Sequence, residues 1–146
     1  MKHYKQYING QFVESKSTGV IEIVNPCTEE VISTISTGTV EDADNALEAA
    51  QAAQPAWEAL PAIQRASFLH KMADIIRENR VFLAETLSKE QAKVIGLAQV
   101  EIEVTADYFD YNAGWARRIE GEIIQSDREK EHIYLHKVPI GVAVGI

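Results

Sequence analysis

The sequence contains a single cysteine, Cys27, and only four prolines among its 146 residues. One cysteine cannot form an internal disulfide, which excludes a small secreted domain held together by disulfides. No apolar run approaches the roughly 18 residues of a membrane span, and the first ten residues lack the apolar core of a signal peptide. We therefore expect a cytoplasmic protein that has no membrane partner.

Positive charge is also scarce, with 14 lysines and arginines against 22 aspartates and glutamates, a formal net charge of −8. This balance repels nucleic-acid phosphates, so we expect no nucleic-acid partner. Hydrophobic residues make up 46% and charged residues 25% of the chain, which is the composition of a folded globular protein. The length is that of about one domain.

Short β-strands are predicted over residues 6–35, where apolar and polar residues alternate and turn-forming residues separate the runs. Asn9-Gly10 lies in the middle of one such run, YINGQFV. Both residues tolerate positive φ, so we predict a tight hairpin at this point.

From Thr39 onward the apolar residues recur with the period of a helix. Thr39 and Asp42 match a capping box, which predicts a helix that runs to about Gln54 and stops before Pro55. Further helices are predicted from about residue 61, over 81–89 and over 97–118. The last has two apolar faces, so we expect it to be covered on both sides. One face comprises Leu97, Val100, Val104, Tyr108, Tyr111 and Trp115, and the other Ile102, Ala106, Phe109 and Ala113.

Two antiparallel strands are predicted after Gly121, in GEIIQSD and HIYLHKV, around a charged turn at residues 128–130. The apolar run VAVGI at 142–146 is typical of a strand buried on both faces of a parallel sheet. A parallel strand needs a neighbour that a crossover of a dozen or more residues delivers, and no such crossover follows. We therefore expect a truncated protein.

No catalytic or metal site emerges from the residues alone. Cys27 lies in a turn beside two glutamates and has no cation or histidine near it in sequence to form a thiolate, so we interpret it as a turn residue. His132 and His136 share a strand face but lack a third ligand. Glu101 and Glu103 are two apart on a helix, so they face different directions, and we expect them to be solvated or ion-paired.

Five segments nevertheless stand out when they are taken in order: YINGQFVES, VNPCTEEVIS, PAWEALPAIQRASFLHKMADIIREN, YFDYNAGWARRIEGEIIQSD and KVPIGVAVGI. Together they resemble the N-terminal region of the NAD(P)-dependent aldehyde dehydrogenase family, and the fourth is most similar to bacterial lactaldehyde dehydrogenases. The resemblance covers nearly the whole chain.

The resemblance implies an α/β fold that is a fragment of the aldehyde dehydrogenase fold. Residues 1–120 would supply N-terminal strands and about four helices of the cofactor-binding region. Residues 121–138 would form an oligomerisation hairpin, and residues 139–146 would begin the dinucleotide-binding domain. The family oxidises aldehydes, here a small one such as lactaldehyde, through a cysteine thioester and with NAD(P) as hydride acceptor. Its catalytic Cys, Glu and Asn follow the part represented here, so we carry over no catalytic residue and expect the chain alone to bind no cofactor and to be inactive.

Three sites are implied by the resemblance. Ile146 matches a position that lines the dinucleotide groove, or is a plain buried isoleucine. Val100 and Val104 match positions in the wall of the aldehyde tunnel, but ordinary core packing also explains them, and we favour core packing because valine is usually buried. Glu90, with the carbonyls of Ile23 and Val24, matches a monovalent-cation site of some members, but we favour a solvated glutamate and expect no metal.

One residue departs from the family pattern, because Ala92 stands where members generally have glycine at a helix end. Either the turn is built differently here or selection on it has been lost.

An alternative function from another class is also open: a truncated interaction module without catalysis. In either case we expect a homo-oligomer formed through the 121–138 hairpin.

Overall fold

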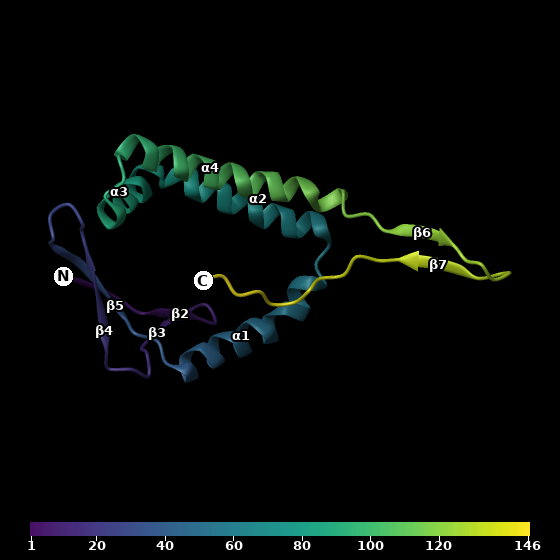
Figure 1. Ribbon diagram of the computed structural model, residues 1–146, viewed down its shortest axis with the longest axis horizontal. Helices are drawn as coiled ribbons and strands as arrows, with labels where there is room; N and C mark the ends of the chain where they lie inside the picture. Colours follow the sequence, from purple (N-terminus) through teal and green to yellow (C-terminus); the bar gives the residue numbers. More distant parts are fainter.

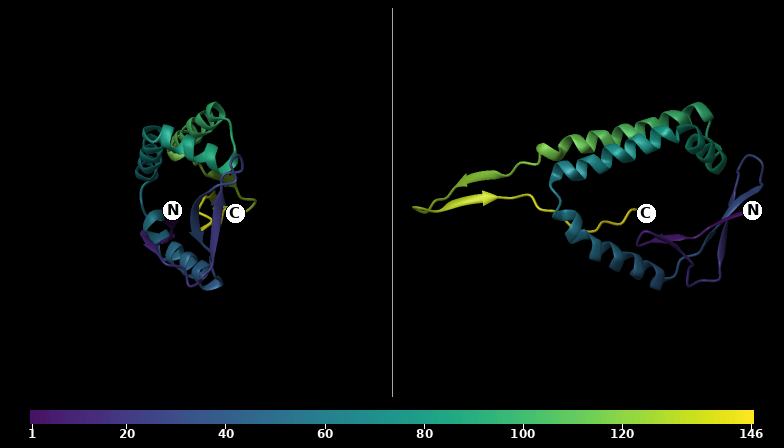
Figure 2. Two further views of the ribbon diagram at one scale, coloured as in Figure 1. Left: turned by 90° about the vertical axis from the view of Figure 1, so that its left-hand side faces the viewer. Right: turned by 180° about the vertical axis from the view of Figure 1, so that it is seen from behind.

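The computed structural model describes all residues 1–146 as an α/β arrangement of four long helices and three small sheets (Figure 1). The helices at 62–78 and 95–113 lie side by side, and the last two strands project beyond their ends, as the view from the front (Figure 1) and the view from behind (Figure 2) both show. No helix is long and apolar enough to cross a membrane. The helices are α1 (Val40–Glu58), α2 (Ala62–Glu78), α3 (Arg80–Gln91), α4 (Ile95–Ala113) and the 3₁₀ turn η1 (Gly114–Arg117). The strands are β1 (Lys2–Tyr4), β2 (Gln6–Ile8), β3 (Gln11–Val13), β4 (Val20–Val24), β5 (Val31–Ser36), β6 (Glu122–Gln125) and β7 (His132–Leu135).

The predicted hairpin at Asn9-Gly10 is confirmed, with β2 and β3 paired antiparallel. Asn9 and Gly10 have φ angles of 52° and 76°, which a two-residue turn of this kind requires. β4 and β5 also pair antiparallel, and β1 joins β5 in parallel to complete a three-stranded sheet in the order β1-β5-β4. Strand β1 was not predicted from the sequence, because its partner lies about thirty residues further along the chain.

Helix α1 begins at the predicted capping box. The Thr39 side chain accepts a hydrogen bond from the backbone N–H of Asp42, and the Asp42 carboxylate accepts one from the Thr39 N–H at 2.9 Å. The predicted end before Pro55 is wrong, because the helix continues to Glu58 with Pro55 inside it. Pro55 removes one hydrogen bond near the end of the helix, but its carbonyl still accepts from the N–H of Ala59 at 3.0 Å, so the last turn is kept.

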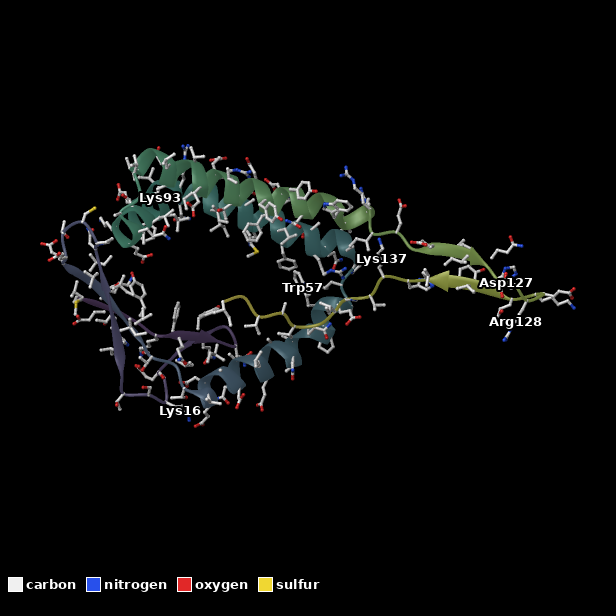
Figure 3. The ribbon with its side chains drawn as sticks, in the orientation of Figure 1. Lys16, Trp57, Lys93, Asp127, Arg128 and Lys137 are labelled. Atoms are coloured by element: carbon white, nitrogen blue, oxygen red, sulfur yellow. The ribbon has the colours of Figure 1, made fainter.

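The corner between α1 and α2 is closed by side chains of α2. Arg65 donates to the backbone carbonyls of Glu58, at 3.0 Å, and Leu60, which are left without helical partners at the end of α1. The rings of Trp57 and Phe68 lie 5.5 Å apart across the same corner, where Figure 3 labels Trp57. This corner therefore joins the two helices by both polar and aromatic contacts.

The helices pack through small side chains. Six of the nine buried residues are alanines, and no large side chain is fully buried. Alanine lets two helices approach closely but buries little apolar surface. The buried alanines are Ala66 and Ala73 of α2, Ala84 of α3, and Ala98, Ala106 and Ala113 of α4.

The long helix predicted over 97–118 is α4 followed by η1, so the helical region is confirmed but its last turn tightens to a 3₁₀ helix. The expectation that both faces are covered is wrong within this chain. Ala106 and Ala113 of the second face are buried, whereas every member of the stripe from Leu97 to Trp115 is exposed. The covered face is the one that α2 and α3 contact.

The predicted antiparallel pair after Gly121 is confirmed as β6 and β7. A side chain at Gly121 would meet the Leu135 carbonyl oxygen at 2.1 Å, so the start of this hairpin requires glycine. The strand expected at 142–146 is absent, because residues 139–146 form no strand. The full exposure of Ile146 agrees with the expectation that this chain supplies no neighbour for the run. An apolar segment cannot form a strand without a neighbour for its backbone N–H and C=O groups.

The end of α3 shows that the turn at Ala92 is not built differently. Ala92 adopts the left-handed conformation, with φ 56° and ψ 26°, so the turn is built as a glycine would build it. A side chain in this conformation costs about 1 kcal/mol.

We therefore expect Ala92→Gly to stabilise the end of α3 by about 1 kcal/mol, because glycine adopts positive φ without a steric penalty. Amide hydrogen exchange over residues 88–93 should slow about fivefold. Ala84→Gly, within the same helix but with helical geometry, is the matched control and should speed exchange instead. Faster exchange in Ala92→Gly would contradict the expectation.

Candidate functional site

The exposed face of α4 carries the two valines that the sequence analysis matched either to a substrate wall or to core packing. Val100 and Val104 lie one helical turn apart, with 56% and 58% of their surfaces exposed. The apolar stripe continues along the same face towards η1 through three aromatic residues. The rings of Tyr108 and Tyr111 stack at 6.0 Å, and Tyr111 meets Trp115 edge-on at 6.3 Å. This face is thus available to form one wall of an apolar site.

A row of acidic residues on α4 lies beside this stripe and forms ion pairs with Arg77 of α2. The Arg77 guanidinium lies 3.2 Å from Glu103 Oε1, 2.7 Å from Asp107 Oδ1 and 2.8 Å from Asp110 Oδ2. His70 Nδ1, also on α2, lies 2.6 Å from Asp110 Oδ1. His70 and Arg77 together hold the pKa of Asp110 below its usual range, and the three carboxylates raise the pKa of Arg77.

The sequence analysis did not identify this Arg77 cluster, although a signal for it was present. Positions 103, 107 and 110 are spaced by four and three, which places three carboxylates on one edge of a helix. Such a row repels itself unless a cation faces it. The expectation that Glu101 and Glu103 are solvated or ion-paired is confirmed, because Glu101 pairs with Lys93 and Glu103 with Arg77.

Ile146 is not brought into a site by this structure. It lies in a segment without strand structure, and its side chain contacts no sheet of the chain. A dinucleotide groove in an α/β fold is built by neighbouring parallel strands and the loops that follow them. Residues 139–146 as they stand do not fit a dinucleotide, so we derive no binding step from them.

Cys27 lies exposed in the turn between β4 and β5, where its backbone N–H donates to the Asn25 side-chain oxygen at 2.9 Å. No histidine or cation contacts its thiol, so the structure offers no activation of a nucleophile at this point. Its interpretation as a turn residue agrees with this geometry.

The implied cation site is only partly assembled. Glu90 of α3 and Ile23 of β4 line one cavity of about 780 Å³ between the helix and the sheet, but Val24 is not among its lining residues. No group of three or more His, Cys, Asp or Glu side chains lies close enough to hold a metal ion. His132 lies in β7, and His136 lies beyond the end of that strand.

Comparisons with known proteins give a consistent result. The family description "Aldehyde dehydrogenase family" matches residues 12–146. The chain is 52% identical to lactaldehyde dehydrogenase of Escherichia coli K12 over 143 residues, which are 98% of this chain and 30% of that protein. It is 43% identical to 3,6-anhydro-alpha-L-galactose dehydrogenase of Vibrio sp. EJY3 over 146 residues, which are 100% of this chain and 30% of that protein.

Solved structures agree with these sequence matches. A 3,6-anhydro-L-galactose dehydrogenase in complex with NAP superposes with a TM-score of 0.91 at 38% identity, covering 94% of this chain and 29% of the other. The E. coli lactaldehyde dehydrogenase superposes with a TM-score of 0.88 at 52% identity, covering 90% and 28%. The α/β arrangement of this chain is therefore that of the N-terminal part of these enzymes. The chain spans about 30% of the length of the curated relatives it matches.

Proposed function

The chain belongs to the aldehyde dehydrogenase family, and from this premise we propose that it serves as the N-terminal part of an NAD(P)-dependent enzyme that oxidises a small aldehyde such as lactaldehyde to the acid. The observation that carries the proposal is the 52% identity to E. coli lactaldehyde dehydrogenase across 98% of this chain. The nicotinamide cofactor supplies the hydride acceptor when it is bound. We place the enzyme in the cytoplasm, where Cys27 and the catalytic cysteine of the family would stay reduced.

Two parts of the chain, and two valines within the first part, have proposed roles. Residues 1–120 supply the strands and helices that support the cofactor-binding region, and residues 139–146 begin the dinucleotide-binding domain, with Ile146 beside the groove. Val100 and Val104 form part of the apolar wall of the aldehyde tunnel, a role that suits their exposure on α4. The catalytic Cys, Glu and Asn of the family belong to the remainder of the enzyme, so we propose that the chain alone is inactive.

A fusion protein tests this function directly. Residues 1–146 are joined to the part of E. coli lactaldehyde dehydrogenase that follows its matched region, and NADH formation from lactaldehyde is measured. We expect a kcat/KM within about tenfold of that enzyme's own, because the two N-terminal parts share a backbone and half their residues. The isolated chain should form no NADH, and Cys27→Ala should leave the fusion unchanged.

Two results would count against the proposal. A fusion that purifies as a folded oligomer and yet forms no NADH would show that this chain cannot serve as the N-terminal part of such an enzyme. NADH formation by the isolated chain would show that its inactivity was wrongly inferred.

The exposed hairpin favours a second candidate, an interaction module that forms homo-oligomers through residues 121–138. Every residue of β6 and β7 is exposed, and Ile123 and Tyr134 are cross-strand partners on one face. Figure 3 shows Asp127 and Arg128 at the tip, far from the helices. A two-stranded ribbon leaves two strand edges free to pair with another chain.

Light scattering of the isolated chain tests the hairpin. We expect a mass above that of one chain, and the double variant Ile123→Lys/Tyr134→Lys should shift it towards the monomer because two positive charges then replace the apolar face of the ribbon and repel those of a second copy. Lys substitutions at Glu129 and Glu131, in the loop, are the matched control and should leave the mass unchanged. An unaltered mass in the double variant would remove the hairpin from the interface.

A further inference from the structure

The contact between α2 and α4 is made largely by small side chains. The buried residues of these two helices at the contact are alanines, Ala66 and Ala73 on α2 and Ala106 and Ala113 on α4, and the larger side chains on the same face of α4, Ile102 and Phe109, are only half-buried. Long side chains that interlock in the grooves of a partner helix resist rotation about the helix axis, whereas alanine has no atoms beyond Cβ to interlock. A directional polar contact would therefore add to the packing that holds α4 at one rotation.

The Arg77 cluster is in a position to do so. A single planar guanidinium bridges three carboxylates that α4 presents from successive turns, over a length of seven residues. Arginine holds several carboxylates in fixed directions because its five N–H donors lie in one plane. Arg80, in contrast, reaches only Glu103, at 4.0 Å.

The acidic row and the proposed substrate wall lie on adjoining edges of the same helix. At 100° per residue, Glu103 lies 60° from Val100 around the axis, and Asp107 lies 60° from Val104. Any rotation that stretched the contacts of Arg77 would move the two valines by the same angle. The ion cluster and the apolar wall are therefore geometrically coupled through one rigid helix.

We infer that Arg77 is a positioning residue for substrate binding: by bridging Glu103, Asp107 and Asp110 it fixes the rotation of α4 and so places Val100 and Val104 in the aldehyde wall. This inference rests on the proposed function. Arg77 touches no reacting atom, and its effect should appear in how the aldehyde is held rather than in the chemical step.

The test uses the active fusion protein described above. Arg77→Leu should raise KM for lactaldehyde about fivefold or more while kcat changes less than about twofold and KM for NAD stays constant, because only the aldehyde wall moves. Arg77→Lys should fall between, since one ammonium cannot bridge three carboxylates. Lys71→Leu, an exposed cation of α2 without an ion pair, is the matched control and should leave all three constants unchanged.

A milder variant covers the case in which Arg77→Leu does not fold. Asp107→Asn removes the charge of one of the three carboxylates that Arg77 bridges, and it should also raise KM for the aldehyde, by a smaller factor. An unchanged aldehyde KM in a variant whose melting temperature falls would show that Arg77 only stabilises the fold, and would overturn the inference while the proposed function stands. Inactivity of the unmodified fusion would overturn both.

Discussion

The isolated chain is expected to bind the dye ANS strongly and to melt over a broad temperature range. Only nine of its 146 residues are buried, and none of them has a large side chain. Buried apolar area is the main favourable term in folding, and alanines contribute little of it, so the four helices lack a core that unfolds as one unit. Helical circular dichroism with a broad thermal transition is the signature to measure.

The exposed α4 stripe should be the main dye-binding surface. A contiguous apolar face of this kind is rare on a monomeric soluble protein. The double variant Leu97→Ser/Tyr108→Ser, which spares the two valines of the proposed wall, should lower ANS fluorescence clearly. Val40→Ser, at an exposed valine outside the stripe, is the control and should lower it little. A sharp transition in a dilute monomer that binds no dye would contradict the expectation.

Local sequence signals located most elements of this fold correctly. Three of these elements depend on residues close together in sequence, so local patterns are enough to predict them. They are the hairpin at Asn9-Gly10, the capping box at Thr39 and the pair β6–β7. Contacts over long distances were missed. Strand β1 depends on a parallel partner in β5, and its pairing is reinforced by His3, whose Nδ1 lies 2.9 Å from Thr34 Oγ1.

The failures of the sequence reading have two physical causes. The sequence predicted that the helix ends before Pro55 because proline usually breaks the interior of a helix. Near a helix end, however, proline removes only one hydrogen bond. Residues 142–146 have the composition of a buried strand, but composition cannot supply the neighbours that a strand needs. The exposed stripe of α4 has the same explanation: its apolar pattern is correct and no element of this chain covers it.

The candidate site could be predicted only through the family resemblance. Val100 and Val104 look like ordinary core residues in a helical pattern, and nothing in their spacing distinguishes a tunnel wall from packing. The Arg77 cluster is different, because three acidic residues on one helix edge already require a facing cation. Its partner on α2 could not be chosen without knowing how the two helices are aligned.

The Asp42→Ala substitution is expected to disrupt the start of α1 severely. Asp42 is 5% exposed and its carboxylate accepts hydrogen bonds from the Ser15 hydroxyl at 2.7 Å, the Lys16 backbone N–H at 3.1 Å, and the Thr39 backbone N–H and hydroxyl, both at 2.9 Å. It thus joins the segment after β3 to the first turn of the helix. Alanine would remove the capping box and take away the acceptor that these partly buried donors share, although the Ser15 hydroxyl still reaches the Thr37 carbonyl at 2.6 Å.

Hydrogen exchange measures this effect locally, without requiring that the chain unfold as one unit. The amides of residues 39–44 should exchange about tenfold faster or more in Asp42→Ala, while those of α4 are unaffected. Asp44→Ala, at an exposed acidic residue of the same turn that makes no side-chain hydrogen bond, is the matched control. Equal exchange in the two variants would show that the carboxylate of Asp42 contributes nothing particular to the helix start.

The same carboxylate should make the start of α1 sensitive to acid. The Ser15 hydroxyl and the donors of Thr39 and Lys16 lower the pKa of Asp42 well below its ordinary value. Since the pKa is lower in the folded chain than in the unfolded one, the stabilisation is complete above about pH 4 and is lost as the pH falls further, towards the folded pKa. Asp42→Asn keeps the shape but cannot titrate, so protection of residues 39–44, corrected for the intrinsic exchange rate, should decline below pH 4 in the unmodified chain and stay level in this variant. A parallel decline in both would assign the acid sensitivity to other groups, of which the Asp110 carboxylate beside Arg77 is the first to examine.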